Sequence, residues 1–166
     1  MKVLISRCLL GHPCRYDGRV VTDIRHLLIQ NGVPEEAWIP VCPEVEGGLS
    51  TPRLPSEISA GNASDVLNGR ARVLASDGTD NTAAFMKGAS IAAARCRTHS
   101  IRVALLKSKS PSCGCGKVYD GTFSGCLKDG DGLTTQVLRP LGVRIFNEHE
   151  IELLSTFLKA GNDRDC

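Results

Sequence analysis

Three cysteines follow three short apolar segments of the chain, and thiols in this arrangement could bind a metal cofactor. Cys8 follows residues 2–5, Cys42 follows residues 38–41 and Cys113 follows residues 103–106. Parallel strands end side by side at one edge of a sheet, so thiolates that are distant in the sequence can meet there. Three such thiolates can hold an iron–sulfur centre and leave one position open for chemistry.

Glycine and proline accompany each of these cysteines, as Gly11, Pro43, Pro111 and Gly114 show. These residues let a backbone bend around a bulky inorganic group, and backbone N–H groups there can donate to its sulfides. A single buried cysteine is more often a small, inert core residue. That explanation weakens when three cysteines occupy equivalent places.

Cys14 lies close to Cys8 and has three possible roles: a fourth ligand, a thiol used in catalysis, or a core residue. The sequence leaves these alternatives open. The remaining four cysteines are assigned no chemistry: Cys96, Cys115, Cys126 and Cys166.

Polar side chains accompany two of the cysteine loops. Glu44 follows Cys42 by two residues, so its carboxylate could exchange a proton with a substrate held at the same centre. The alternative is a carboxylate that caps a helix or pairs with Arg53. In the third loop, the hydroxyls of Ser110 and Ser112 can donate and accept hydrogen bonds, although serines in such loops are more often turn formers.

The composition excludes several classes of protein. The chain has 166 residues, which fits one domain, and a net charge of only +2, with no basic stripe that would bind an extended nucleic acid. The N-terminal apolar run is too short for a secretory signal, and no run reaches membrane-spanning length. We therefore expect a single cytoplasmic domain.

Eight cysteines in a reducing compartment indicate metal binding or thiol chemistry rather than disulfides. A zinc site is disfavoured because the chain has no CxxC pair and its histidines are scattered. The histidines are His12, His26, His99 and His149.

The apolar pattern predicts buried strands alternating with helices. We expect strands at residues 2–5, 38–41, 72–75, 103–106 and 143–146. We expect helices at residues 22–30, 80–97, 134–139 and 148–159. This alternation predicts an α/β fold: a single Rossmann-like domain, residues 1–166, with a mostly parallel central sheet flanked by helices.

Three segments lack this pattern. Residues 43–68 are rich in glycine and proline and are predicted to form a long ordered loop. The tripeptide Tyr-Asp-Gly, at residues 16–18 and 119–121, is interpreted as two turns. The tail after about residue 160 carries no signal and is expected to be disordered.

Five motifs in order resemble the thiouracil desulfidase family, and the resemblance extends to about Glu148. The motifs are Cys8-Leu9-Leu10-Gly11 with Cys14-Arg15-Tyr16-Asp17-Gly18, Pro40-Val41-Cys42-Pro43-Glu44, Gly47-Gly48-Leu49-Ser50-Thr51-Pro52-Arg53, Lys109-Ser110-Pro111-Ser112-Cys113-Gly114 and Tyr119-Asp120-Gly121-Thr122-Phe123-Ser124-Gly125.

The resemblance implies a 4Fe-4S cluster held by Cys8, Cys42 and Cys113, with one iron open for the substrate sulfur. The catalytic candidates are Glu44, Ser110, Ser112 and Cys14, and the substrate-binding candidates are Arg53, Gly47 and Gly48.

The implied reaction is the non-redox hydrolysis of a free thiopyrimidine such as thiouracil to uracil and hydrogen sulfide. Two alternatives belong to other classes. One is an iron–sulfur redox or sensor protein, in which Cys14 would close the cluster. The other is a structural metal-binding protein without catalysis.

Overall fold

Four parallel strands form the centre of the protein. The computed structural model describes residues 1–20 and 22–162. The central strands are β1 (Val3–Ser6), β2 (Trp38–Val41), β5 (Val103–Leu106) and β8 (Arg144–Asn147), in the order β2-β1-β5-β8. The expected strands at 2–5, 38–41, 103–106 and 143–146 agree with these to within one residue. The prediction of an α/β fold with a parallel central sheet is confirmed.

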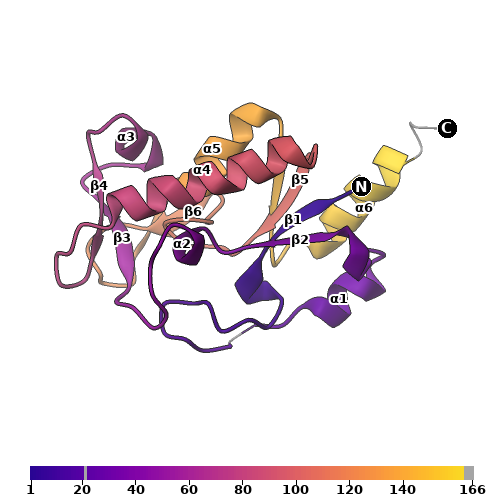
Figure 1. The fold of residues 1–166 in the computed structure, drawn as a ribbon, viewed down its shortest axis with the longest axis horizontal. Coiled ribbons are helices and arrows are strands. Elements are labelled where there is room, and N and C mark those ends of the chain that lie inside the picture. Colours follow the sequence, from indigo (N-terminus) through magenta and orange to yellow (C-terminus); the bar gives the residue numbers. More distant parts are fainter. Residues whose placement is uncertain (21, 163–166) are drawn as a thin grey trace.

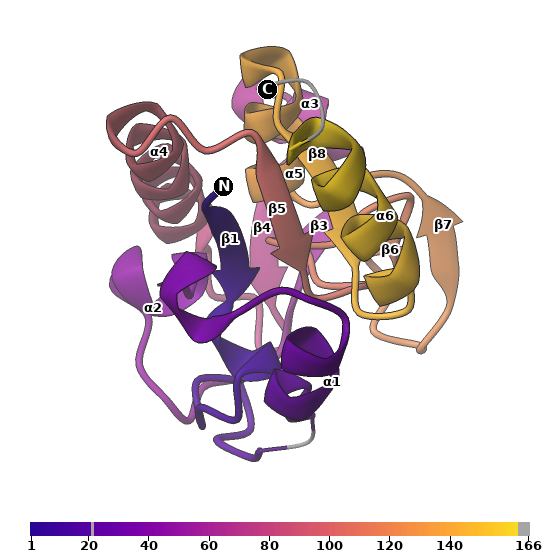
Figure 2. The ribbon, with the colours of Figure 1, turned by 90° about the vertical axis from the view of Figure 1, so that its right-hand side faces the viewer.

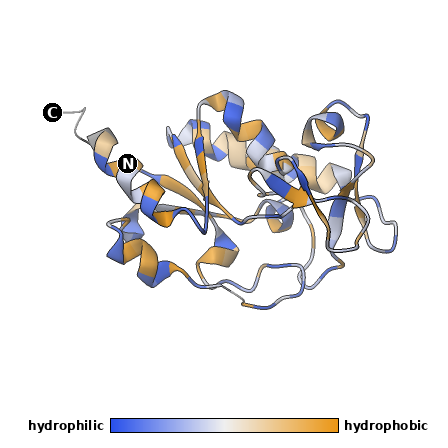
Figure 3. Ribbon diagram, turned by 180° about the vertical axis from the view of Figure 1, so that it is seen from behind, coloured by the Kyte–Doolittle hydropathy of each residue, from blue (hydrophilic) through white to orange (hydrophobic). Residues whose placement is uncertain are grey.

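Helices cover both faces of this sheet (Figures 1 and 2). They are α1 (Arg25–Gln30) and α6 (Ile151–Asn162) on one face, and α4 (Thr82–Thr98) and α5 (Leu133–Leu138) on the other. Successive residues of strand β1 contribute to different cores: Val3 belongs to the core that contains Leu154, and Leu4 belongs to the core that contains Ala92. Every residue of β1 and of β5 is buried, as expected for parallel strands covered on both faces. The hydropathy colouring in Figure 3 shows the same apolar strands between helices of mixed character.

The helices predicted at 22–30, 80–97, 134–139 and 148–159 are present, with ends shifted by up to three residues. Two of the shifts have a clear cause. Asp23 and Asp80 each accept the backbone N–H two residues later, so they precede their helices. Residues 163–166, in the tail expected to be disordered, lie outside the described residues. No helix in the described part of the chain is long and apolar enough to cross a bilayer.

Of two predictions for the region after Cys42, the strand is confirmed and the loop is wrong. Residues 72–75 form a strand, β4 (Arg72–Ala75), but it pairs antiparallel with β3 (Ser56–Ser59) outside the central sheet. Residues 43–68, predicted as a loop, contain α2 (Pro43–Glu46), β3 and α3 (Ala63–Leu67). Each of these elements has only four or five residues, which is too short to give a periodic pattern.

A second antiparallel pair, β6 (Lys117–Tyr119) and β7 (Leu127–Asp129), was also not predicted. It forms a hairpin in which the second Tyr-Asp-Gly motif spans the end of β6 and the start of the connection. A turn was expected there, but the three-residue strands around it leave little signal in the sequence.

Two glycines bring helices α2 and α4 into backbone contact. A Cβ atom at Gly47 would lie 2.1 Å from the carbonyl oxygen of Ala84, and one at Gly88 would lie 1.9 Å from that of Pro43. Because α2 directly follows Cys42 and carries Glu44, this contact fixes the position of both candidate residues.

Gly88→Ala is therefore expected to destabilise the protein by about 1–3 kcal/mol, because the added methyl group forces the helices apart. The steric cost outweighs the higher helix propensity of alanine. Chemical denaturation measures the change, and Ser90→Ala, at an exposed position of the same helix, is the control. If Gly88→Ala lowers the free energy of unfolding no more than Ser90→Ala does, the contact between the two helices is not tight.

Candidate functional site

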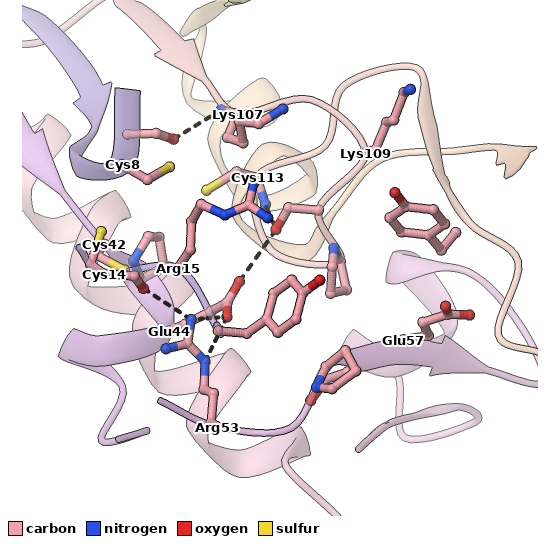
Figure 4. Close-up of a pocket in the computed structure, with 18 of the residues that line it drawn as sticks. Cys8, Cys14, Arg15, Cys42, Glu44, Arg53, Glu57, Lys107, Lys109 and Cys113 are labelled. Carbon is pink, nitrogen blue, oxygen red and sulfur yellow. Dashed lines mark hydrogen bonds and ion pairs between the residues drawn. The ribbon is translucent and has the colours of Figure 1, made fainter. Parts of the chain in front are cut away.

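A cavity of about 510 Å³ lies at the carboxyl ends of the central strands (Figure 4). Its walls come from the loops after β1, β2 and β5, from strand β3, and from the β6–β7 hairpin. This is the edge of the sheet where ligands of α/β proteins usually bind. The volume is within the ~300–1,000 Å³ range of small-molecule sites.

Four cysteines line this cavity: Cys8, Cys14, Cys42 and Cys113. Cys8 lies in a short 3-10 helix, Arg7–Leu9, directly after β1, and Cys42 directly follows β2. Cys113 is the seventh residue of the loop between β5 and β6, residues 107–116. The structure thus brings together the three cysteines that the sequence places after strands.

Cys14 lies beside two of these cysteines. The thiol of Cys42 donates to the Cys14 carbonyl oxygen at 3.8 Å, and the Cys14 side chain is hydrogen-bonded to those of Cys42 and Cys8. Figure 4 shows the sulfurs of Cys14 and Cys42 next to each other. All the cysteines in the described residues are free thiols, and Cys96, Cys115 and Cys126 lie outside the cavity.

The ionisation of the thiols reflects their surroundings. The hydrogen bond to Cys14 and burial together raise the pKa of Cys42. Burial raises the pKa of Cys113 to about 12, although Ser6 and Ser112 partly oppose it. Without a positive partner such as a metal, these thiols are therefore protonated at neutral pH.

In cluster-free, reduced protein at pH 8, we expect iodoacetamide to label Cys126 at least about tenfold faster than Cys113. Cys126 is exposed, whereas Cys113 is buried with a raised pKa. Mass spectrometry of peptides after a short pulse gives the two rates. Equal rates would mean that Cys113 is more accessible and more ionised than the structure shows.

Glu44 is held from two sides. Arg53 donates to its Oε2 atom from Nε at 3.0 Å and also from the Nη2 atom, and Ser110 Oγ donates to its Oε1 atom at 3.3 Å. Arg53 also donates to the Cys14 carbonyl oxygen at 3.3 Å. The Ser110 hydroxyl accepts the backbone N–H of Cys113 at 3.2 Å. The carboxylate is thus fixed relative to the cysteine loops, and the pairing with Arg53 considered from the sequence is present.

Three predicted site residues do not line the cavity. Ser112 is fully buried and its hydroxyl bonds that of Thr134 at 3.1 Å. Gly47 packs against α4, and Gly48 is exposed with φ +113°. Ser112 and Gly47 are packed against neighbouring elements and Gly48 lies in a turn, so we assign these residues no part in the chemistry.

Glu46, which the sequence analysis did not single out, ties two cysteine loops together. Its Oε1 atom accepts the backbone N–H of Cys42 at 3.2 Å and pairs with Arg7, the neighbour of Cys8, at 3.2 Å. Its other oxygen pairs with Arg95 of α4 at 2.8 Å. Sequence alone gives no signal for this, because the partners are distant along the chain.

Cations outnumber carboxylates around the cavity. Its charged lining comprises Arg7, Arg15, Arg53, Lys107 and Lys109, against Glu44 and Glu57. Lys107 is paired with Glu148, whose side chain is 7% exposed and which does not line the cavity. A positive environment of this kind favours thiolates and other anions.

The cysteine donor set fits an iron–sulfur cluster by its chemistry. Among the described residues, no three His, Cys, Asp or Glu side chains are grouped so as to hold one metal ion. The cysteines instead come from different loops around the cavity (Figure 4). In a multi-iron cluster each thiolate binds a different iron, so wider spacing is expected, and soft thiolates select iron–sulfur centres.

Aromatic residues of the cavity were missed from the sequence. Tyr16, Tyr119 and Phe123 line it, the last two from the β6–β7 hairpin. The Tyr-Asp-Gly motifs were interpreted only as turns. The signal in the sequence that could have identified them was an aromatic residue within a glycine-containing loop, because loops often carry functional residues.

The fold and the cavity together define an α/β protein with a cysteine-lined cavity at the carboxyl edge of its parallel sheet. The family model for 2-thiouracil desulfurase matches residues 3–150, and the chain belongs to this family. The resemblance drawn from the sequence motifs is confirmed.

Two relatives match over nearly their whole lengths. The chain is 40% identical over 149 residues to the uncharacterized protein YbbK of Bacillus subtilis (strain 168), covering 90% of this chain and 97% of YbbK. It is also similar to the solved structure of the 4Fe-4S-dependent thiouracil desulfidase TudS. That match has a TM-score of 0.84 and 40% identity, and covers 96% of this chain and 98% of TudS.

Proposed function

We propose that this protein is an iron–sulfur-dependent desulfidase that converts thiouracil to uracil and hydrogen sulfide. The observation that carries the proposal is the convergence of thiols from three strand-end loops on one cavity that also holds Glu44. Membership of the 2-thiouracil desulfurase family and the similarity to a 4Fe-4S-dependent thiouracil desulfidase support the same reaction.

Cys8, Cys42 and Cys113 are the proposed ligands of a 4Fe-4S cluster. When bound, a cluster with one iron free of protein ligands supplies a Lewis acid for the soft thione sulfur of the substrate. The hydrogen bond to Cys14 and burial favour the protonated thiol of Cys42, and burial favours that of Cys113, so the irons of a cluster would supply the positive charge that the thiolates need. Cys14 stays outside this ligand set, as a neighbouring thiol.

Glu44 is the proposed general base. Arg53 occupies its Oε2 atom, which leaves Oε1, bonded to the Ser110 hydroxyl, to take a proton. A water molecule that attacks the thione carbon can release its proton to Glu44 directly or through Ser110. The substrate gains the oxygen of this water and loses its sulfur as hydrogen sulfide, so no electrons are gained or lost.

The proposed substrate is a free thiopyrimidine in the cytoplasm. The cavity is of small-molecule size, and the chain carries a net charge of only +2, without the strong positive charge of a protein that binds extended nucleic acid.

The test is anaerobic reconstitution with iron and sulfide, followed by addition of 2-thiouracil or 4-thiouracil. Loss of the thione absorbance with release of sulfide is expected. A stable cluster with no turnover of either base would favour a redox or sensor protein. In that protein Cys14, which lies beside Cys8 and Cys42, would be the fourth ligand of the cluster.

A further inference from the structure

Phe123 has a strained backbone at the edge of the cavity. Its φ angle is +57°, in the left-handed region that non-glycine residues with bulky side chains rarely adopt. The residue lines the cavity and is 40% exposed, so burial of the ring in a core does not explain the strain. Such strain persists only where the surroundings impose it, and it is common where it serves function.

Glu57 is hydrogen-bonded to the segment that carries Phe123. It lies on β3, is 7% exposed, and its Oε2 atom accepts the backbone N–H groups of Gly121 at 2.8 Å and Phe123 at 3.1 Å. Within the described residues, Glu57 forms no ion pair. A nearly buried carboxylate is costly unless its hydrogen bonds are satisfied, and here two of them go to the segment that carries Phe123.

Lys128, on strand β7, forms hydrogen bonds that join the same segment to β3 and the loop after it. Its ammonium donates to the carbonyl oxygens of Gly61 at 2.7 Å, Asp120 at 3.0 Å and Ile58 at 3.4 Å. Gly121 lies so close to β3 that a Cβ atom there would be 2.4 Å from the Ile58 oxygen. Two charged side chains and a glycine thus hold the tip of the hairpin against β3.

We propose that the ring of Phe123 forms the wall against which the face of the substrate pyrimidine packs, and that Glu57 is the positioning residue that holds it there. This inference rests on the proposed function and names the residue that selects a flat heteroaromatic ring. Stacking of a base on an aromatic side chain gives a substantial share of binding without requiring a particular base.

The test compares steady-state kinetics of reconstituted variants on the thiouracil that the wild type converts. Phe123→Leu is expected to raise KM by roughly tenfold, with kcat changed less and iron content unchanged. Leu127→Ala is the matched control, because Leu127 lies on the same hairpin, is also 40% exposed and does not line the cavity. Its KM should equal that of the wild type.

Two further variants separate binding from stability. Phe123→Gly relieves the positive φ, so its thermal stability should hold or rise while KM rises as for Phe123→Leu. Glu57→Leu should raise KM in the same way, whereas Glu57→Gln, which retains an acceptor oxygen, should recover most of the loss.

The outcomes distinguish the two proposals. A wild type that converts thiouracil, with Phe123→Leu and Phe123→Gly both within twofold of its KM, would overturn the role of Phe123 alone. A reconstituted wild type that converts no thiouracil would overturn the proposed function and this inference with it.

Discussion

Replacing Cys42 with serine is expected to remove bound iron and to lower turnover by at least about 100-fold. Serine is nearly the same size, so the fold is retained, but its hydroxyl is a poor ligand for the irons of a cluster. Cys42 directly follows β2, and its backbone N–H donates to Glu46 at 3.2 Å, which fixes the position of this loop. Cys8→Ser and Cys113→Ser should behave alike.

Iron content per chain and turnover are measured on the same anaerobically reconstituted samples. Cys126→Ser is the control, because Cys126 is exposed and lies outside the cavity. Cys14→Ser should retain iron, since Cys14 is not among the proposed ligands. Loss of iron in Cys14→Ser together with its retention in Cys42→Ser would show that the ligand set is assigned wrongly.

Glu44→Gln is expected to keep the cluster and to lower kcat by roughly 10²–10⁴-fold, the usual contribution of a general base. The amide keeps the shape of the side chain but cannot take a proton from water. The guanidinium of Arg53 is left without its counter-charge, and its side chain is only 8% exposed, so the variant should also be less stable.

The assay is therefore run well below the melting temperature of the variant, with iron content measured beside kcat. Glu152→Gln, at an exposed position of α6, is the control for a change of charge alone. An iron-loaded Glu44→Gln enzyme with wild-type kcat would remove Glu44 from the mechanism.

The strands of the central sheet and the cysteines after them could be predicted from the sequence because their signals are local. Residues 103–106, for example, are a continuous apolar run, and the structure buries all four in a parallel strand. The rule that parallel strands end at one edge then places Cys8, Cys42 and Cys113 together without any knowledge of their contacts.

The hydrogen bonds and ion pairs that hold the site in place could not be predicted, because they join residues that are distant in the sequence. Glu57 and Phe123 are 66 positions apart, and Lys107 and Glu148 are 41 apart. Ser110 and Ser112 look equivalent in the sequence, yet the turn directs one hydroxyl to Glu44 and the other to Thr134. The elements within residues 43–68 are too short for periodicity and are stabilised by local caps and packing, such as the capping box of Asn62 and Asp65.

The most direct test of cluster-dependent hydrolysis is turnover measured against cluster content. Samples reconstituted to different cluster occupancies are given thiouracil anaerobically without an electron donor, and uracil and sulfide are both quantified. We expect the rate to rise in proportion to cluster occupancy, with one sulfide released per uracil and no need for a reductant. Turnover in cluster-free protein, or turnover that requires an electron donor, would contradict the proposed function.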